Sequence, residues 1–168
     1  MFKMTNLSKF LIAVIFLLWG SEGCFAQSKK DIRKNNIKGV TEIVTEYENG
    51  KESVHNDVSK KFDKEGEVIQ ELNYDKNGVL KEKILTKNNK DGDKIEETIF
   101  DASGKQTKRF TYKYDSFGEK IEEIQYDAKN ALLTKSVYTS NNKGLKTERK
   151  TYDSKGKLIQ AKKYTYEF

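Results

Sequence analysis

Residues 114–130 read YDSFGEKIEEIQYDAKN and contain the same short sequence motif twice. In each copy an aromatic residue and an Asp are followed, three residues after the Asp, by Gly118 or Asn130. An Asp at the first position of a turn accepts hydrogen bonds from backbone N–H groups further along the turn. A Gly at the fourth position takes a positive φ without a Cβ penalty, and Asn is the best substitute there. The stretch therefore predicts two type I turns closed by G1 bulges, a common β-hairpin connection.

The same turn motif recurs on both sides of this stretch. The turn-closing positions alternate at spacings of 12 and 14 residues, which makes the repeat unit 26 residues long, and such periodicity marks a repeat architecture. The units cover about residues 63–88, 89–114, 115–140 and 141–166. We interpret these positions as structural turns rather than as chemistry. The expected turn residues are Asp63, Gly66, Asp75, Gly78, Asn89, Gly92, Asp101, Gly104, Asp115, Gly118, Asp127, Asn130, Asn141, Gly144, Asp153 and Gly156.

The segments between the turns predict β-strands. They are runs of about eight and ten residues, rich in Ile, Thr, Val and Tyr, in a chain that has no Pro. An earlier turn at Asn49-Gly50 adds a leading hairpin that starts at TEIVTEY, residues 41–47. We therefore expect an all-β fold, an antiparallel meander of about ten strands.

The faces of these strands predict how the sheet is shaped. Neither face is cleanly apolar, whereas a sandwich needs one apolar face on each sheet. One arrangement is an extended single layer held by cross-strand pairs. The other curls the sheet so that Leu80, Ile84, Phe110 and Leu132 share a thin concave core. We favour an extended or curled, largely single-layer sheet over a closed barrel.

The N-terminus predicts export. Residues 1–26 combine two lysines, the apolar run FLIAVIFLLW and small residues near a cleavage point, which is typical of a signal peptide. With Cys24 and Ala26 at positions −3 and −1, we expect cleavage before Gln27 and a periplasmic or secreted protein. No second hydrophobic segment follows, so we expect no membrane span after cleavage. An alternative stays open, in which Cys24 is the lipidated anchor of a bacterial lipoprotein.

The charge distribution argues against a nucleic-acid partner. The formal net charge is +6, but five of these net charges lie in residues 1–38, and Lys and Glu interleave in the rest. A nucleic-acid binder concentrates basic residues on one face. We interpret residues 27–40 as a basic polar tether, solvated, ahead of a β-repeat domain over residues 41–168.

The residues that carry catalysis or bind metals are scarce. The one His, His55, has no Cys to join it after residue 26, and the ligand run of a calcium loop is missing. No nucleophile motif or phosphate-binding Gly loop appears. Adjacent carboxylates such as Glu96 and Glu97 point to opposite faces of a strand, so they make no acid/base pair. We therefore predict no catalytic residue, no metal site and no cofactor.

Tyrosines are the best candidates for binding. Three of them, Tyr112, Tyr138 and Tyr164, occupy the same place in successive units, and Tyr114 and Tyr166 follow two residues later. Such rows can stack sugars or line a peptide groove. Packing of neighbouring aromatic rings across strands is the ordinary alternative.

The recurring aromatic-Asp-x-x-Gly motif resembles the repeat of the YD-repeat, or Rhs-type, family of bacterial surface and secreted proteins. The resemblance covers about residues 47–166 and is carried by Tyr74-Asp75 to Gly78, Tyr114-Asp115 to Gly118, Tyr126-Asp127 to Asn130 and Tyr152-Asp153 to Gly156. It implies a strip-like β-sheet, and carbohydrate binding has been proposed for some members. From its length we do not expect this chain to enclose a cargo, and we expect no toxin-like C-terminal domain.

Together these features predict an exported, non-enzymatic β-repeat protein at the cell envelope. Its surface would bind a glycan or an envelope protein, or serve a structural role. The alternative is a hydrolase that cleaves envelope polysaccharide or peptidoglycan with scattered carboxylates.

Overall fold

The computed structural model of the protein describes residues 28–48 and 51–167. The expected signal peptide, its cleavage site before Gln27, the alternative anchor Cys24 and the Asn49-Gly50 turn lie outside the described residues. One helix, α1 (Lys29–Lys34), precedes the strands. The strands are β1 (Gly39–Glu48), β2 (Lys51–Phe62), β3 (Val68–Tyr74), β4 (Leu80–Asn88), β5 (Lys94–Asp101), β6 (Gln106–Tyr114), β7 (Lys120–Tyr126), β8 (Leu132–Ser140), β9 (Lys146–Asp153) and β10 (Leu158–Lys163).

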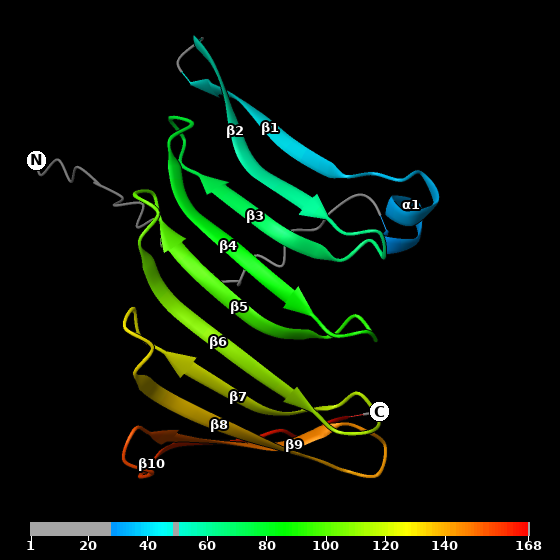
Figure 1. The fold of residues 1–168 in the computed structure, drawn as a ribbon, viewed down its shortest axis with the longest axis vertical. Coiled ribbons are helices and arrows are strands. Elements are labelled where there is room, and N and C mark those ends of the chain that lie inside the picture. Colours follow the sequence, from blue (N-terminus) through cyan, green and yellow to red (C-terminus); the bar gives the residue numbers. More distant parts are fainter. Residues whose placement is uncertain (1–27, 49–50, 168) are drawn as a thin grey trace, which may run out of the picture.

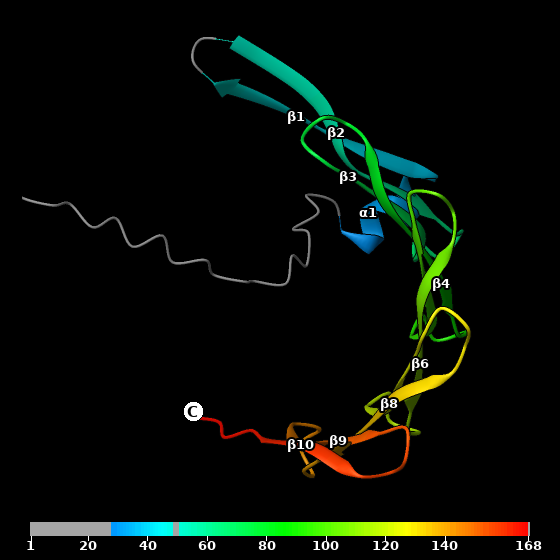
Figure 2. The ribbon, with the colours of Figure 1, turned by 90° about the vertical axis from the view of Figure 1, so that its left-hand side faces the viewer.

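The ten strands form one antiparallel meander. Each strand pairs with the next in the chain, in the order β1 to β10, so β1 and β10 are the two edges of an open sheet (Figure 1). This confirms the predicted fold class. Figure 2 shows that the sheet bends into an arc, with α1 on the inner side, which we call the concave face. Within the described part of the chain, no helix has the length and apolar character needed to cross a membrane.

The predicted turns have the expected backbone geometry. The closing glycines have φ between +72° and +89°, and Asn130 has φ of +63°. In the 115–118 turn the Gly118 N–H donates to the Asp115 carbonyl oxygen at 3.2 Å. The Asp115 Oδ1 accepts from the backbone N–H groups of Phe117 and Glu119, each at 2.9 Å. Each turn thus satisfies its own backbone locally and reverses the chain into the next strand.

The expectation of a solvated tether over residues 27–40 is wrong for its middle part. Residues 29–34 form α1, capped by the Ser28 hydroxyl, which accepts from the Asp31 N–H at 3.2 Å. Ile32 in this helix is only 6% exposed. The helix lies against the β2–β3 turn, where a Cβ added to Gly66 would come within 3.1 Å of the Arg33 Cγ. The buried Ile32 and the Ser28 cap therefore hold this segment in a helix, although its composition alone is typical of a linker.

The sheet has almost no apolar core. Among the described residues, Ile32 and Phe62 are the only buried hydrophobic side chains. Of the residues expected to form a thin core, Ile84 is half-buried, whereas Leu132 is 37% exposed. Cross-strand polar pairs contribute instead, as where the Glu122 carboxylate joins Lys113 at 2.8 Å and Lys135 at 2.6 Å. The architecture is a single layer held by neighbouring strands.

Candidate functional site

Strand register places the polar and aromatic candidates on one face. Tyr112 on β6 is opposite Glu123 on β7, and Tyr138 on β8 is opposite Arg149 on β9. Glu123 is in turn opposite Ser136 on β8. Directly opposed residues of antiparallel strands project to the same side, so these side chains share one face of the sheet. This face continues to β5, because Glu97 on β5 is opposite Phe110 on β6.

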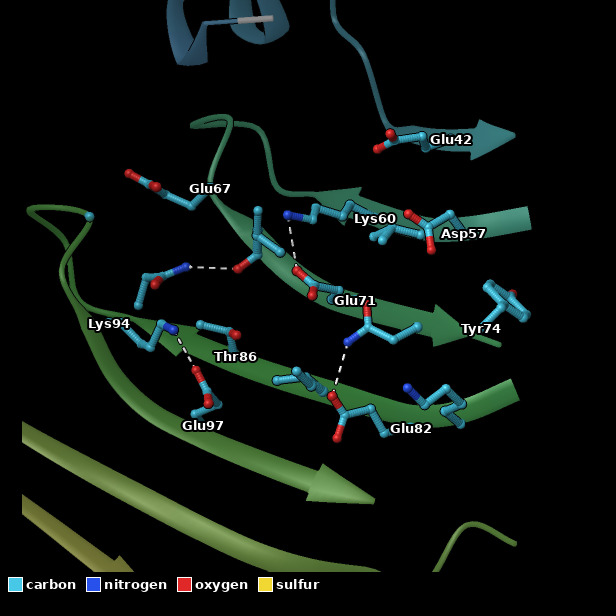
Figure 3. Close-up of a pocket in the computed structure, with 17 residues that line it drawn as sticks. Glu42, Asp57, Lys60, Glu67, Glu71, Tyr74, Glu82, Thr86, Lys94 and Glu97 are labelled. Carbon is cyan, nitrogen blue, oxygen red and sulfur yellow. Dashed lines mark hydrogen bonds and ion pairs between the residues drawn. The ribbon is translucent and has the colours of Figure 1, made fainter. Parts of the chain in front are cut away.

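A polar groove of about 1010 Å³ occupies the β1–β5 part of this face (Figure 3). Glu67 on its wall pairs with Lys29 of α1, which identifies the groove as part of the concave face. Carboxylates outnumber cations in the lining. Its charged residues are Glu42, Asp57, Lys60, Glu67, Glu71, Lys81, Glu82, Lys94 and Glu97.

The polar groups of the groove are held in place by one another. Lys60 pairs with Glu71 at 3.0 Å, and the Asn73 amide donates to the Glu82 carboxylate at 3.0 Å. Lys94 pairs with Glu97 at the end nearest β6. Groups ordered in this way present fixed donors and acceptors to a polar ligand, which lowers the ordering cost of binding.

A second cluster lies further along the concave face, around two tyrosines. The Lys120 ammonium lies 5.1 Å from the centre of the Tyr112 ring and 5.0 Å from that of Tyr138. Lys146 and Arg149 also approach the Tyr138 ring, at 5.2 Å and 5.6 Å. Cations within about 6 Å of a ring are attracted to its face. The two rings are thereby held in position, and we call these five side chains the tyrosine–cation cluster.

Glu123 connects the cluster electrostatically. Its carboxylate accepts from the Tyr138 hydroxyl at 3.1 Å and pairs with Lys120 at 2.8 Å and with Arg149 at 3.5 Å. Burial opposes ionisation of Glu123, but Lys120, the Tyr138 hydroxyl and Arg149 together outweigh it and hold the pKa of Glu123 below the usual value. Burial, together with the Glu123 charge, raises the pKa of Tyr138 to about 12. The site thus keeps an ionised carboxylate beside a neutral phenol.

Glu123 should make stability depend on pH in the acid range. A carboxylate whose folded pKa is depressed contributes stability above its unfolded pKa of about 4.3, and this contribution is lost as pH falls through the folded pKa. We expect Glu123→Gln to cost about 1 kcal/mol at neutral pH. The difference from wild type should shrink below about pH 4. Urea unfolding across pH measures it, with the exposed Glu65→Gln as control; a difference independent of pH would contradict the assignment.

The other three tyrosine candidates, Tyr114, Tyr164 and Tyr166, lie outside the tyrosine–cation cluster. The Tyr114 hydroxyl donates to the Lys94 carbonyl oxygen at 2.9 Å, and the Tyr166 hydroxyl donates to that of Lys146 at 2.7 Å. Tyr164 follows β10 and is 37% exposed. The structure therefore brings Tyr112 and Tyr138 together around Lys120, whereas Tyr114 and Tyr166 make a contact that ties neighbouring strands.

Sequence reasoning missed the cations of the cluster. Lys94, Lys120 and Lys146 occupy one repeat position, 26 residues apart, and after Lys94 and Lys120, in the second and third units, a Glu follows three residues later. In the fourth unit, after Lys146, the residue at this position is Arg149. The periodicity of Lys was a usable signal, and the change from Glu to Arg adds positive charge at the β9 end of the concave face.

Metal ligation has no cluster to support it in the part of the chain that the structure describes. No group of three or more His, Cys, Asp or Glu side chains there is arranged to hold an ion.

Comparison with known proteins identifies no family. No family model matches the chain, and no curated protein matches it. Among solved structures, the chain is similar to TarM, with 22% identity and a TM-score of 0.32 over 78% of this chain and 22% of TarM. It is also similar to a porin-like protein from Bacteroides uniformis, with 12% identity and a TM-score of 0.35 over 76% of this chain and 78% of that protein. The chain spans about a fifth of TarM, and scores this low give no basis for transferring a fold or a function.

Proposed function

We propose that this chain is an exported, non-enzymatic β-repeat protein that binds a glycan of the cell envelope along its concave face. The observation that carries the proposal is the pair of rings, Tyr112 and Tyr138, held by Lys120 on the same curved surface as a polar groove. Export rests on the signal-peptide pattern of residues 1–26.

The chemistry of the concave face suits a sugar polymer. A sugar ring offers an apolar C–H face that stacks on an aromatic ring and hydroxyls that pair with carboxylates, amides and ammonium groups. Tyr112 and Tyr138 supply the first kind of contact, and groove residues such as Glu71, Asn73 and Glu82 supply the second. Because the groove and the two tyrosines together extend over strands β1 to β8, they match an elongated ligand better than a small molecule.

The electrostatics favour binding over hydrolysis. A general acid for glycoside cleavage needs a carboxyl group whose pKa is raised, so that it holds a proton near neutral pH. Glu123, the carboxylate that contacts Tyr138, has its pKa lowered rather than raised, because Lys120, Tyr138 and Arg149 stabilise its charged form. This supports the role of a hydrogen-bond acceptor rather than that of a proton donor.

Tyr138→Ala should weaken glycan binding by about tenfold or more, as expected for an aromatic anchor. Envelope polysaccharides are screened on an array, and each hit is measured by calorimetry. Tyr126→Ala is the matched control: Tyr126 is opposite Arg109 of β6, whose guanidinium lies 4.0 Å from its ring on the convex side, so affinity should not change.

Four results would oppose the proposal. Glycan affinity that is insensitive to Tyr138→Ala, or equally reduced by Tyr126→Ala, would remove the tyrosines from the site. Binding to an envelope protein with no glycan hit would make the occupant a protein. Turnover of a cell-wall substrate that Glu123→Gln abolishes would favour the hydrolase alternative.

A further inference from the structure

The two edge strands carry opposite charges. Strand β1, GVTEIVTEYE, has three glutamates and no basic residue. Strand β10, LIQAKK, has two lysines and no acidic residue. Most interior strands mix both signs, but β3 has only an acidic residue, and β6 and β8 have only basic ones. What matters for association is that the two free edges differ in sign.

Both edges are open and partly apolar. Among the described residues no strand pairs with the outer side of β1 or β10. Ile43 and Tyr47 on β1 are 62% and 75% exposed, and Ile159 on β10 is 54% exposed. An open edge presents unpaired backbone N–H and C=O groups and is a template for another strand.

We propose that β1 of one copy of this chain pairs with β10 of a second copy, so that the sheet continues head to tail. Charge complementarity makes β10 of a second copy the expected partner of β1. Two β1 edges would bring glutamates together and two β10 edges would bring lysines together, and like charges across an interface oppose association. Only the unlike pair, β1 with β10, joins acidic to basic strands.

The strand count makes this pairing geometrically continuous. Neighbouring strands alternate in direction along the meander, so β10, the tenth, runs opposite to β1. A second copy in the same orientation therefore presents its β1 antiparallel to β10 of the first. An odd number of strands would require a parallel pair at the junction.

The charged side chains also meet on the same face. Glu42 lines the groove, and Glu46, four residues along β1, projects to the same concave side. Lys162 on β10 is opposite Arg149, which belongs to the tyrosine–cation cluster of that face. In a continuous sheet Glu46 and Lys162 would therefore lie on one surface, and the concave face would extend from one copy to the next.

The experiment measures association of the purified protein by sedimentation velocity from about 1 μM to about 1 mM, where weak contacts become populated. We expect concentration-dependent assembly that weakens as salt rises. Glu46→Lys and Lys162→Glu should each weaken self-association by about tenfold or more. A mixture of these two variants should assemble again, because each then offers an edge opposite in sign to one on the other.

Asp91→Lys, in an exposed turn away from both edges, is the matched control and should leave assembly unchanged. Three outcomes would overturn the proposal: a monomer over the whole concentration range, assembly that survives both edge variants, or a mixture that remains monomeric. Glycan binding by a monomer is independent of this result, so failure here does not bear on the proposed function.

Discussion

Phe62→Ala is expected to lower the free energy of unfolding by about 3–5 kcal/mol, the usual cost of removing a buried Phe side chain. Phe62 closes β2 and is only 6% exposed, and Ile32 is the only other buried hydrophobic side chain among the described residues. Its backbone N–H also donates to the Lys38 carbonyl oxygen at 3.0 Å, next to the start of β1. A single-layer sheet has no second layer to compensate for this loss.

Urea denaturation measures the effect, and Phe117→Ala is the matched control. Phe117 lies in a turn and is 88% exposed, so its removal should change stability by less than about 0.5 kcal/mol. Because repeat arrays couple mainly to nearest neighbours, hydrogen exchange in Phe62→Ala should increase first in α1 and β1 to β3. Equal effects of the two substitutions would contradict the assignment of Phe62 as a core residue.

Gly66→Val should destabilise the protein more than Gly118→Val, although both glycines have φ of +82°. A β-branched residue forced to positive φ costs about 1–3 kcal/mol at either position. At Gly118 an added Cβ meets no atom within 4 Å, whereas at Gly66 it comes within 3.1 Å of Arg33 and of the Lys29 carbonyl oxygen of α1. Overpacking of this kind adds about 1–3 kcal/mol.

The comparison separates backbone strain from helix docking, since strain is common to both variants. Hydrogen exchange should show loss of protection over residues 29–34 in Gly66→Val only. In Gly118→Val the loss should be confined to the strands flanking residues 114–118. If α1 exchanged equally in the two variants, its contact with the β2–β3 turn would contribute nothing to stability.

The meander could be predicted from the sequence because its determinants are local. Each turn depends on an Asp or Asn and on a Gly three residues later, as at Asp115 and Gly118, and both act through the backbone of the same few residues. Asn130 shows what such a pattern omits. Its φ was predictable, but its side-chain oxygen also accepts from the Arg109 Nε at 2.8 Å, a contact with the preceding hairpin.

Features that depend on distant residues were harder to predict. The α1 helix has only six residues and one buried side chain, although Ser28 and Asp31 have the spacing of a capping box, which was an available signal. The sequence periodicity grouped five tyrosines, yet only the cross-strand contacts separate Tyr112 and Tyr138 from Tyr114 and Tyr166, whose hydroxyls bond to the backbone. The curvature of the sheet is the sum of many small strand twists, so it could not be predicted from any single residue.

The 26-residue unit has a consequence for how such a protein evolves. Residues 89–114 contain two turns and the strands β5 and β6, so a recombination event that deletes or duplicates this segment would join equivalent strands on either side. Every unit gained or lost changes the width of the sheet by two strands, about 9–10 Å. The direction of the terminal strands stays the same at each step. Unequal crossing-over could therefore match the reach of this surface to polymers of different lengths, with no need to invent a new turn or a new strand.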